Sequence, residues 1–190
     1  QPSGTEFCTR PAMGDEFIKM MFEIGKILMQ AEAKVNATCG FHVHVDGVDL
    51  SYWQLRELIL LWSIIEKDVR QYLVAPTRLN NRYCMEFKTS IPKEVIERLK
   101  CLNTSKKLRE YLLALVLGTR TDQIGNTVRE GGKGHNHGPL RYLSLNLNSW
   151  TYRGTVEFRL KEGLIDTSEG TAWALFCGWI VEAAAKLPMS

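Results

Sequence analysis

The sequence lacks any long run of charge of one sign, any internal repeat and any low-complexity tract. Its 24 Lys and Arg are interspersed with 21 Asp and Glu, for a formal net charge of +3. Nucleic-acid binding usually requires a clustered basic patch, so we expect no nucleic-acid partner. The two most apolar stretches, 58–65 and 172–181, are shorter than the about 20 residues of a membrane span. They indicate buried helix segments, and we expect no membrane partner.

A cysteine pattern typical of disulfide frameworks or zinc sites is also absent. The chain has an odd number of cysteines, widely scattered, and no Cys-x-x-Cys pair. Residues 1–10 lack the basic end and following apolar run of a secretory signal. These absences favour a reducing compartment and predict a cytoplasmic protein.

The length and composition suit one domain. A chain of 190 residues with 45% hydrophobic side chains can bury a substantial core without being divided. We therefore expect a single catalytic domain over 1–190. The chain opens with Gln1 rather than Met, and its first motif follows within a few residues. This suggests a fragment or a processed product that lacks one or more N-terminal strands.

Hydrophobic periodicity predicts helices separated by short strands. Ser51 is a good N-cap for the second helix. Strands that are separated by helices early and paired late are typical of an α+β fold, with an antiparallel sheet covered by helices on one face. The expected helices span 15–34, 51–72, 92–102, 105–117 and Thr167 or Ser168 to 186; the expected strands span 5–9, 41–45, 141–147 and 155–160, the last two as a hairpin.

The strand at 41–45 carries the strongest chemical signal. Because side chains alternate across a strand, His42, His44 and Asp46 share one face, and apolar residues share the other. Imidazole binds Mn, Zn or Fe well and tolerates Mg. We therefore predict a metal-binding face, the alternative being a solvated face with chance histidines.

Other polar residues qualify as anion or cation ligands. Glu157 and Arg159 share a face of the strand at 155–160. A carboxylate can hold a divalent cation, and a guanidinium can hold a phosphate or carboxylate through two hydrogen bonds. An exposed Glu/Arg alternation is also common on ordinary sheets. The glycine-rich loop at 118–139, which carries His135 and His137, is expected to be either a lid or a variable insertion.

Further cationic and amide side chains lie in the polar loop at 75–85 and in the strand at 141–147. In the loop, Arg78 and Arg82 are either anchors for phosphates or members of an ordinary turn. In the strand, Arg141 and Asn146 are candidates for additional contacts to a bound cofactor.

Taken together, these segments resemble the amidoligase family, a branch of the glutamine synthetase-like carboxylate–amine ligases. One such motif is a weak signal, but four in the same order are specific. The motifs are Gly4-Thr-Glu-Phe-Cys-Thr-Arg-Pro-Ala, Cys39-Gly-Phe-His-Val-His-Val-Asp, Asn81-Arg-Tyr-Cys, and Arg141-Tyr-Leu-Ser-Leu-Asn followed by Thr155-Val-Glu-Phe-Arg.

The resemblance implies a glutamine synthetase-like curved antiparallel sheet that binds ATP with Mg²⁺ or Mn²⁺. It implies that His42 and Glu157 bind the cation bridging the ATP phosphates and that Glu6 binds a second cation. It also implies that Arg159 stabilises the phosphate in flight and that His44 lies beside the nucleotide. Looser candidates for contacts to phosphate, nucleotide or substrate carboxylate are Arg78, Arg82, Arg141 and Asn146.

The implied activity joins a small-molecule or peptide carboxylate to an amine through an acyl phosphate. One feature departs from the family pattern, because no Glu-x-Glu strand precedes Glu6. We therefore hypothesise that this chain alone is inactive or weakened.

Two other functions fit the same residues. The His-x-His-x-Asp strand could serve a metal-dependent hydrolase, although Asp46 is followed by Gly47 and not by a histidine. The chain could also be a non-catalytic domain that keeps a ligase-like fold for binding.

Overall fold

The structure is a computed structural model that describes residues 6–117 and 139–188. The glycine-rich loop with His135 and His137 therefore falls outside the described residues. The elements are α1 (Gly14–Gln30), β1 (Gly40–Asp46), α2 (Tyr52–Leu73), the 3₁₀ turn η1 (Pro76–Arg78), α3 (Phe87–Ser90), α4 (Lys93–Cys101), α5 (Ser105–Leu117), the 3₁₀ turn η4 (Pro139–Tyr142), β2 (Leu145–Asn146), α7 (Asn148–Arg153), β3 (Thr155–Glu162) and α8 (Thr167–Lys186).

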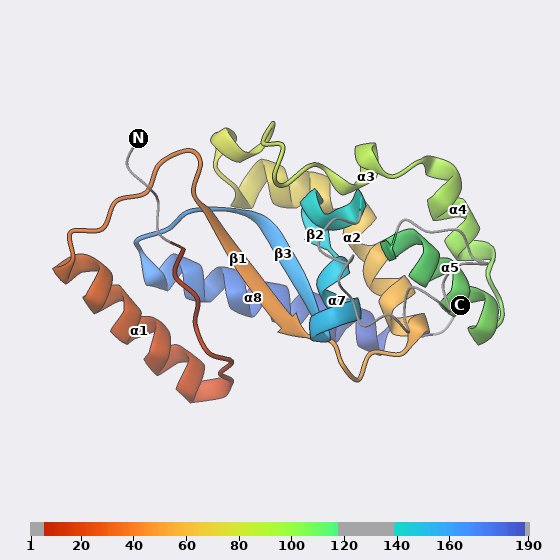
Figure 1. The fold of residues 1–190 in the computed structure, drawn as a ribbon, viewed down its shortest axis with the longest axis horizontal. Helices are drawn as coiled ribbons and strands as arrows, with labels where there is room; N and C mark the ends of the chain where they lie inside the picture. The colour runs from red at the N-terminus through yellow and green to blue at the C-terminus, as the bar shows by residue number, and fades with distance from the viewer. Residues whose placement is uncertain (1–5, 118–138, 189–190) are drawn as a thin grey trace.

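The described residues form one small antiparallel sheet of three strands in the order β1-β3-β2. Figure 1 shows α8 running behind β1 and β3, with α2 farther along the same side. This arrangement confirms the α+β class. The sheet is neither closed nor strongly curled. Of the helices in the described part of the chain, none has the length and apolarity of a membrane span.

Helix α2 joins the helical layer to the sheet. Its N-terminus is closed by a capping box in which the Ser51 hydroxyl accepts from the Gln54 N–H and the Gln54 side chain accepts from the Ser51 N–H. Such caps contribute about 1 kcal/mol. On the inward face, the fully buried Trp62 meets the ring of Phe158 on β3 edge-on at 5.2 Å. The predicted helix at 51–72 is thus confirmed.

A buried polar cluster centred on Glu66 fixes β2 against α2. The Glu66 carboxylate accepts from Arg70, from the Ser144 hydroxyl and from the backbone N–H of Phe87. The Ser144 hydroxyl in turn accepts from the Trp62 indole at 3.0 Å. Burial raises the pKa of Glu66, and its hydrogen bonds act in the opposite direction. Paired buried groups of this kind are costly to break, so the cluster positions the strand beside the site described below.

Several predicted elements differ in the structure. The strand expected at 5–9 is wrong, because residues 6–13 have no regular secondary structure and the segment 6–10 is exposed. The strand expected at 141–147 is reduced to Leu145–Asn146. The η4 turn occupies its start, and Leu143 makes an isolated bridge to Met85. Its two faces are not distinguished by burial, because Ser144 and Asn146 are as buried as the leucines beside them.

The last two strands pair antiparallel as predicted, but a helix and not a tight turn connects them, and some helix ends also differ. Helix α7 lies between β2 and β3 and ends at Gly154, whose φ of +69° is a left-handed conformation that favours glycine. Helix α1 ends at Gln30 rather than 34. Helix α8 is capped by Asp166, whose carboxylate accepts from the Ser168 N–H at 2.8 Å, and not by Thr167 or Ser168.

A β-bulge shapes the pairing of β1 with β3. Phe41 pairs with Lys161 and Val43 with Phe158, so His42 alone faces two residues, 159 and 160. Bulges leave backbone groups unpaired. Arg78 satisfies them: its guanidinium donates to the carbonyls of residues 159 (2.9 Å) and 160 (3.3 Å), with a longer contact of 3.5 Å to the Cys39 carbonyl. Arg78 is 2% exposed and therefore acts as an internal clamp on the bulge.

Candidate functional site

Glu157 is the centre of the candidate site. It lies on β3 directly opposite His44 of β1, and it is 4% exposed. Three nitrogen atoms converge on its Oε1: Arg159 Nη1 at 2.6 Å, His42 Nδ1 at 3.3 Å and His44 Nε2 at 3.7 Å. The register explains this convergence, because His44 pairs with Glu157, and His42 faces residues 159 and 160 two positions farther along the same face.

The second oxygen of Glu157 is held by Asn146. The Asn146 Nδ2 donates to Glu157 Oε2 at 2.5 Å, and its Oδ1 accepts from the backbone N–H of Asn148 at 2.9 Å. The amide is therefore fixed at both ends. Asn146 was predicted as a cofactor contact, whereas the structure places it as the group that orients the central carboxylate. This role depends on the cross-strand pairing of residues 146 and 157, which no local sequence signal gives.

Both histidines are neutral near pH 7. Burial, then the positive charge of Arg159, lowers the pKa of His42 to about 4, against the opposing effect of Glu157. Burial is also the main cause that lowers the pKa of His44, and Glu157 again opposes it. The imidazole contacts to Glu157 are therefore not ion pairs. His44 is oriented by a 2.9 Å hydrogen bond between its Nδ1 and the Thr155 hydroxyl. Neutral imidazole is the form that binds metal.

Arg159 is held from two sides. Its Nη1 pairs with Glu157, and its Nε donates to the carbonyl of Tyr83 at 3.2 Å. The guanidinium also lies 6.0 Å from the ring of Tyr142. The side chain is 12% exposed, so this permanent charge sits at the edge of the site rather than in open solvent.

Two further arginines gather at the same edge. Arg82 lies 4.7 Å over the ring of Tyr83, and Arg141 lies 5.6 Å over the ring of Tyr142. The two tyrosine rings meet edge-on at 5.6 Å. Both tyrosines also contact Arg159, so the tyrosine pair brings the three arginines into one neighbourhood. Such a cluster suits phosphate or carboxylate groups.

The remaining candidates lie elsewhere. The Arg78 guanidinium donates to the carbonyls of residues 159 and 160 at the bulge. Glu6 is exposed in the irregular N-terminal segment, and the described contacts do not bring it to Glu157. Asp46 is at the exposed end of β1, where its Oδ1 accepts from the Val48 N–H at 3.1 Å in a turn.

The donor set suits a divalent cation, although it is not arranged as a finished site. Within residues 6–117 and 139–188, no three His, Cys, Asp or Glu side chains form a ready ligand group. Two ligands of one cation bound at about 2.1 Å lie about 3 Å apart, and the 3.3 Å contact between His42 and Glu157 is close to that. The Arg159 guanidinium now occupies the remaining position at Oε1. Two imidazoles and a carboxylate fit Mn²⁺ well and Mg²⁺ acceptably.

Comparison with protein families agrees with this chemistry. A model of the family described as "Putative amidoligase enzyme" matches residues 4–181. Comparisons with curated proteins and with solved structures found no match. The family match spans most of the chain and includes Glu157, both strand histidines and the arginines around them. The resemblance inferred from the four motifs is confirmed, and the chain belongs to the family described as "Putative amidoligase enzyme", a description that suggests a ligase.

Proposed function

We propose that this protein is an ATP-dependent carboxylate–amine ligase with a glutamine synthetase-like catalytic arrangement. The observation that carries the proposal is the convergence of two neutral imidazoles and one guanidinium on the buried Glu157 carboxylate. Arg82 and Arg141 extend the positive charge beside it. The family description supports the same reaction class.

The reaction explains why such a site is needed. Amide formation from a carboxylate in water is uphill, so the acid must first be activated. Transfer of the γ-phosphoryl group of ATP to the substrate carboxylate gives an acyl phosphate and ADP. An amine then attacks the acyl carbon, inorganic phosphate leaves, and the nitrogen loses a proton. Phosphoryl transfer depends chiefly on positioning and on stabilising the developing negative charge.

The residues of the site divide this work. His42 and Glu157 would hold Mg²⁺ or Mn²⁺, and His44 would lie beside the nucleotide. Glu6 would bind a second cation. The bound cation would supply positive charge to the ATP phosphates. Arg159 would hold the transferred phosphoryl group, because a guanidinium can make two parallel hydrogen bonds to its oxygens. Asn146 and Thr155 keep Glu157 and His44 oriented, as outer partners of metal ligands do.

The structure supports a ligase over a hydrolase built on the His-x-His-x-Asp strand. A hydrolase of that kind would use Asp46 as a third ligand. The Asp46 carboxylate instead accepts from the Val48 N–H in an exposed turn, whereas Glu157 meets both histidines.

Calorimetric titration with a non-hydrolysable ATP analogue tests the proposal. We expect binding that requires Mg²⁺ or Mn²⁺ and that weakens by about tenfold or more in His42→Ala, since outer and inner ligands typically contribute at least that much. His42 points away from the apolar core, so the variant should keep its circular dichroism spectrum. Binding without metal, or a folded wild-type protein that binds no nucleotide, would contradict the proposal. Metal-dependent binding without turnover would favour a non-catalytic domain.

Arg159→Lys should lower the turnover rate by about a hundredfold while changing nucleotide affinity by less than about threefold. Lysine keeps the charge but cannot make the paired contacts that the transferring phosphoryl group requires. The measurement is ADP release under saturating nucleotide, with Arg98→Lys on α4 as the control. An unchanged turnover rate would refute the role given to Arg159.

A further inference from the structure

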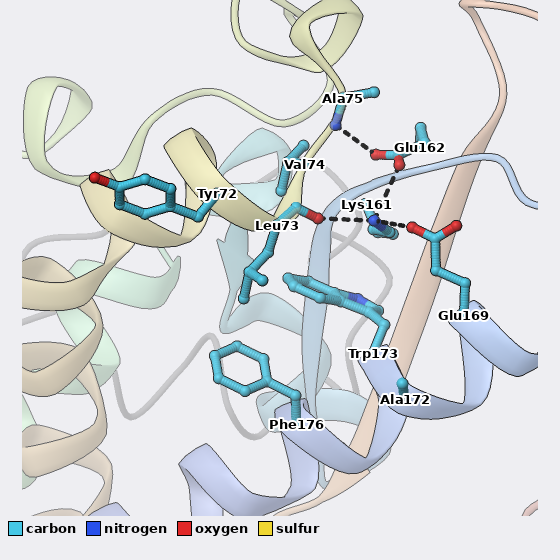
Figure 2. Close-up of a pocket in the computed structure, with 10 residues that line it drawn as sticks. All are labelled: Tyr72, Leu73, Val74, Ala75, Lys161, Glu162, Glu169, Ala172, Trp173 and Phe176. Atoms are coloured by element: carbon cyan, nitrogen blue, oxygen red, sulfur yellow. Dashed lines mark hydrogen bonds and ion pairs between the residues drawn. The ribbon is translucent and has the colours of Figure 1, made fainter.

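A second candidate site lies on the opposite face of the sheet, in a pocket of about 480 Å³. The pocket is formed where α2 ends and α8 begins, and Figure 2 shows its residues. Leu73, Trp173 and Phe176 supply apolar walls, and Lys161, Glu162 and Glu169 supply charge.

Because of the bulge in β3, Lys161 and Glu157 point to opposite faces of the sheet. Lys161 pairs with Phe41, and the Phe41 ring lies against Gly170 of α8. Lys161 also binds Glu169 of α8. Its side chain therefore lies on the helix-covered face, whereas Glu157 meets the histidines on the other face. The pocket shares no residue with the candidate site described above.

The Lys161 ammonium has no donor left for an anion. Its Nζ contacts three acceptors: the Leu73 carbonyl at 2.7 Å, Glu169 Oε1 at 2.6 Å and Glu162 Oε1 at 3.0 Å. An ammonium carries three donors, and all three are used. Burial acts to lower the pKa of Lys161, but hydrogen bonds to Glu169 and Glu162 raise it, so the group is charged near neutral pH.

The remaining charge of the pocket is negative. Lys161 balances one of the two carboxylates, and the C-terminus of α2 adds partial negative charge. The Glu169 side chain is 50% exposed. Figure 2 shows one of its oxygens toward Lys161 and the other turned away from it, and among the described residues only the first has a side-chain partner.

The aromatic walls also favour a positively charged ligand. The rings of Trp173 and Phe176 lie 5.6 Å apart with a tilt of 35°. Aromatic faces attract ammonium and guanidinium groups and also bury apolar carbon. The Lys161 Nζ already lies 6.0 Å from the centroid of the Trp173 ring, so the Phe176 ring is the one left for a ligand cation, and Trp173 serves as an apolar wall. A ligand that combines a cation with a short apolar body matches both features, because the body can cover Leu73 and Phe176 while the cation approaches Glu169.

We propose that this pocket binds a small primary amine with an aromatic or aliphatic body, held by Glu169 and by the rings of Trp173 and Phe176. The proposal is independent of the ligase assignment, since it uses neither Glu157 nor the histidines.

The test uses two probes that share a phenyl ring and a two-carbon linker but carry opposite charge, phenethylamine and 3-phenylpropionate. Binding to the full chain is followed through the indole N–H resonance of Trp173, assigned by its loss in Trp173→Phe. Trp173 lines the pocket, so the chemical shift of its indole N–H should respond to the phenyl ring of a bound probe. We expect a saturable shift with the amine and a weaker or absent one with the carboxylate.

Three variants sharpen the result. Glu169→Gln should weaken amine binding by about fivefold, the scale of a partly exposed ion pair. Phe176→Leu should weaken it through loss of the ring. Glu182→Gln, at the far end of α8 and paired with Lys186, should change nothing. Stronger binding of 3-phenylpropionate, no saturable shift with the amine, or unchanged affinity in a folded Glu169→Gln variant would each overturn the proposal.

Discussion

Replacing Glu157 by glutamine is expected to lower ATP-dependent amide formation by about a thousandfold. The change removes one charge from the group on which His42, His44 and Arg159 converge. Losing one preorganised electrostatic group in a buried catalytic site typically costs a factor of about 10² to 10³. Glutamine keeps the size of the side chain and an oxygen that can still accept from Asn146, so the sheet should survive the substitution.

The experiment measures ADP and amide formation for a carboxylate–amine pair that the wild-type protein couples, together with metal-dependent binding of an ATP analogue. Glu97→Gln, an exposed carboxylate on α4 paired with Lys100, is the matched control and should leave both unchanged. A Glu157→Gln protein with near-normal turnover and unchanged metal dependence would remove Glu157 from the mechanism. Normal turnover with weakened metal dependence would confine its role to cation affinity.

Arg78→Met should destabilise the protein by about 3 kcal/mol. The methionine fills the buried space but leaves the carbonyls of residues 159 and 160 without the donor that now satisfies them. A buried acceptor without a partner costs about 1–3 kcal/mol. The measurement is urea unfolding, in which the midpoint should fall with little change in slope.

Arg82→Met provides the comparison. Arg82 is exposed against the ring of Tyr83, and its loss should change the free energy of unfolding by less than about 0.5 kcal/mol. The pair also decides between two roles for Arg78. If Arg78→Met unfolds at the wild-type urea concentration yet loses nucleotide affinity, the residue contacts phosphate, as the sequence alone suggested, and the clamp is wrong.

Much of the fold follows from local sequence signals. The capping box at Ser51 and the apolar stripe of α2 predict that helix, and strict alternation predicts β1. The segments at 5–9 and 141–147 show the limit of this reasoning. Both have short strand-like alternation, but a strand also needs a partner edge. The segment at 5–9 has no strand partner among the described residues. Most of the segment at 141–147 forms a 3₁₀ turn or makes buried side-chain contacts.

The site was predicted in its residue types and only partly in its geometry. Alternation placed His42 and His44 on one face and Glu157 with Arg159 on another strand, and the structure brings these four together. The alternation pattern could not show that Asn146 would hold Glu157, because register between distant strands is not a local property. Nor could it show that Arg78 faces inward, since a bulge leaves no distinctive local pattern.

The β3 bulge also shifts the alternation of side chains along that strand by one residue. Residues 157, 159 and 161 follow the odd-numbered rhythm that would normally assign all three to one side, yet Lys161 emerges on the other. A one-residue deletion at 159 or 160 would restore simple parity. Lys161 would stay opposite Phe41 on the helix-covered face, but the bulge would be gone, and the Arg78 guanidinium would lose one of the two carbonyls to which it now donates. The number of residues in β3 is therefore constrained as well as their identity. A variant that keeps every functional side chain but lacks the extra residue of the bulge is expected to lose stability.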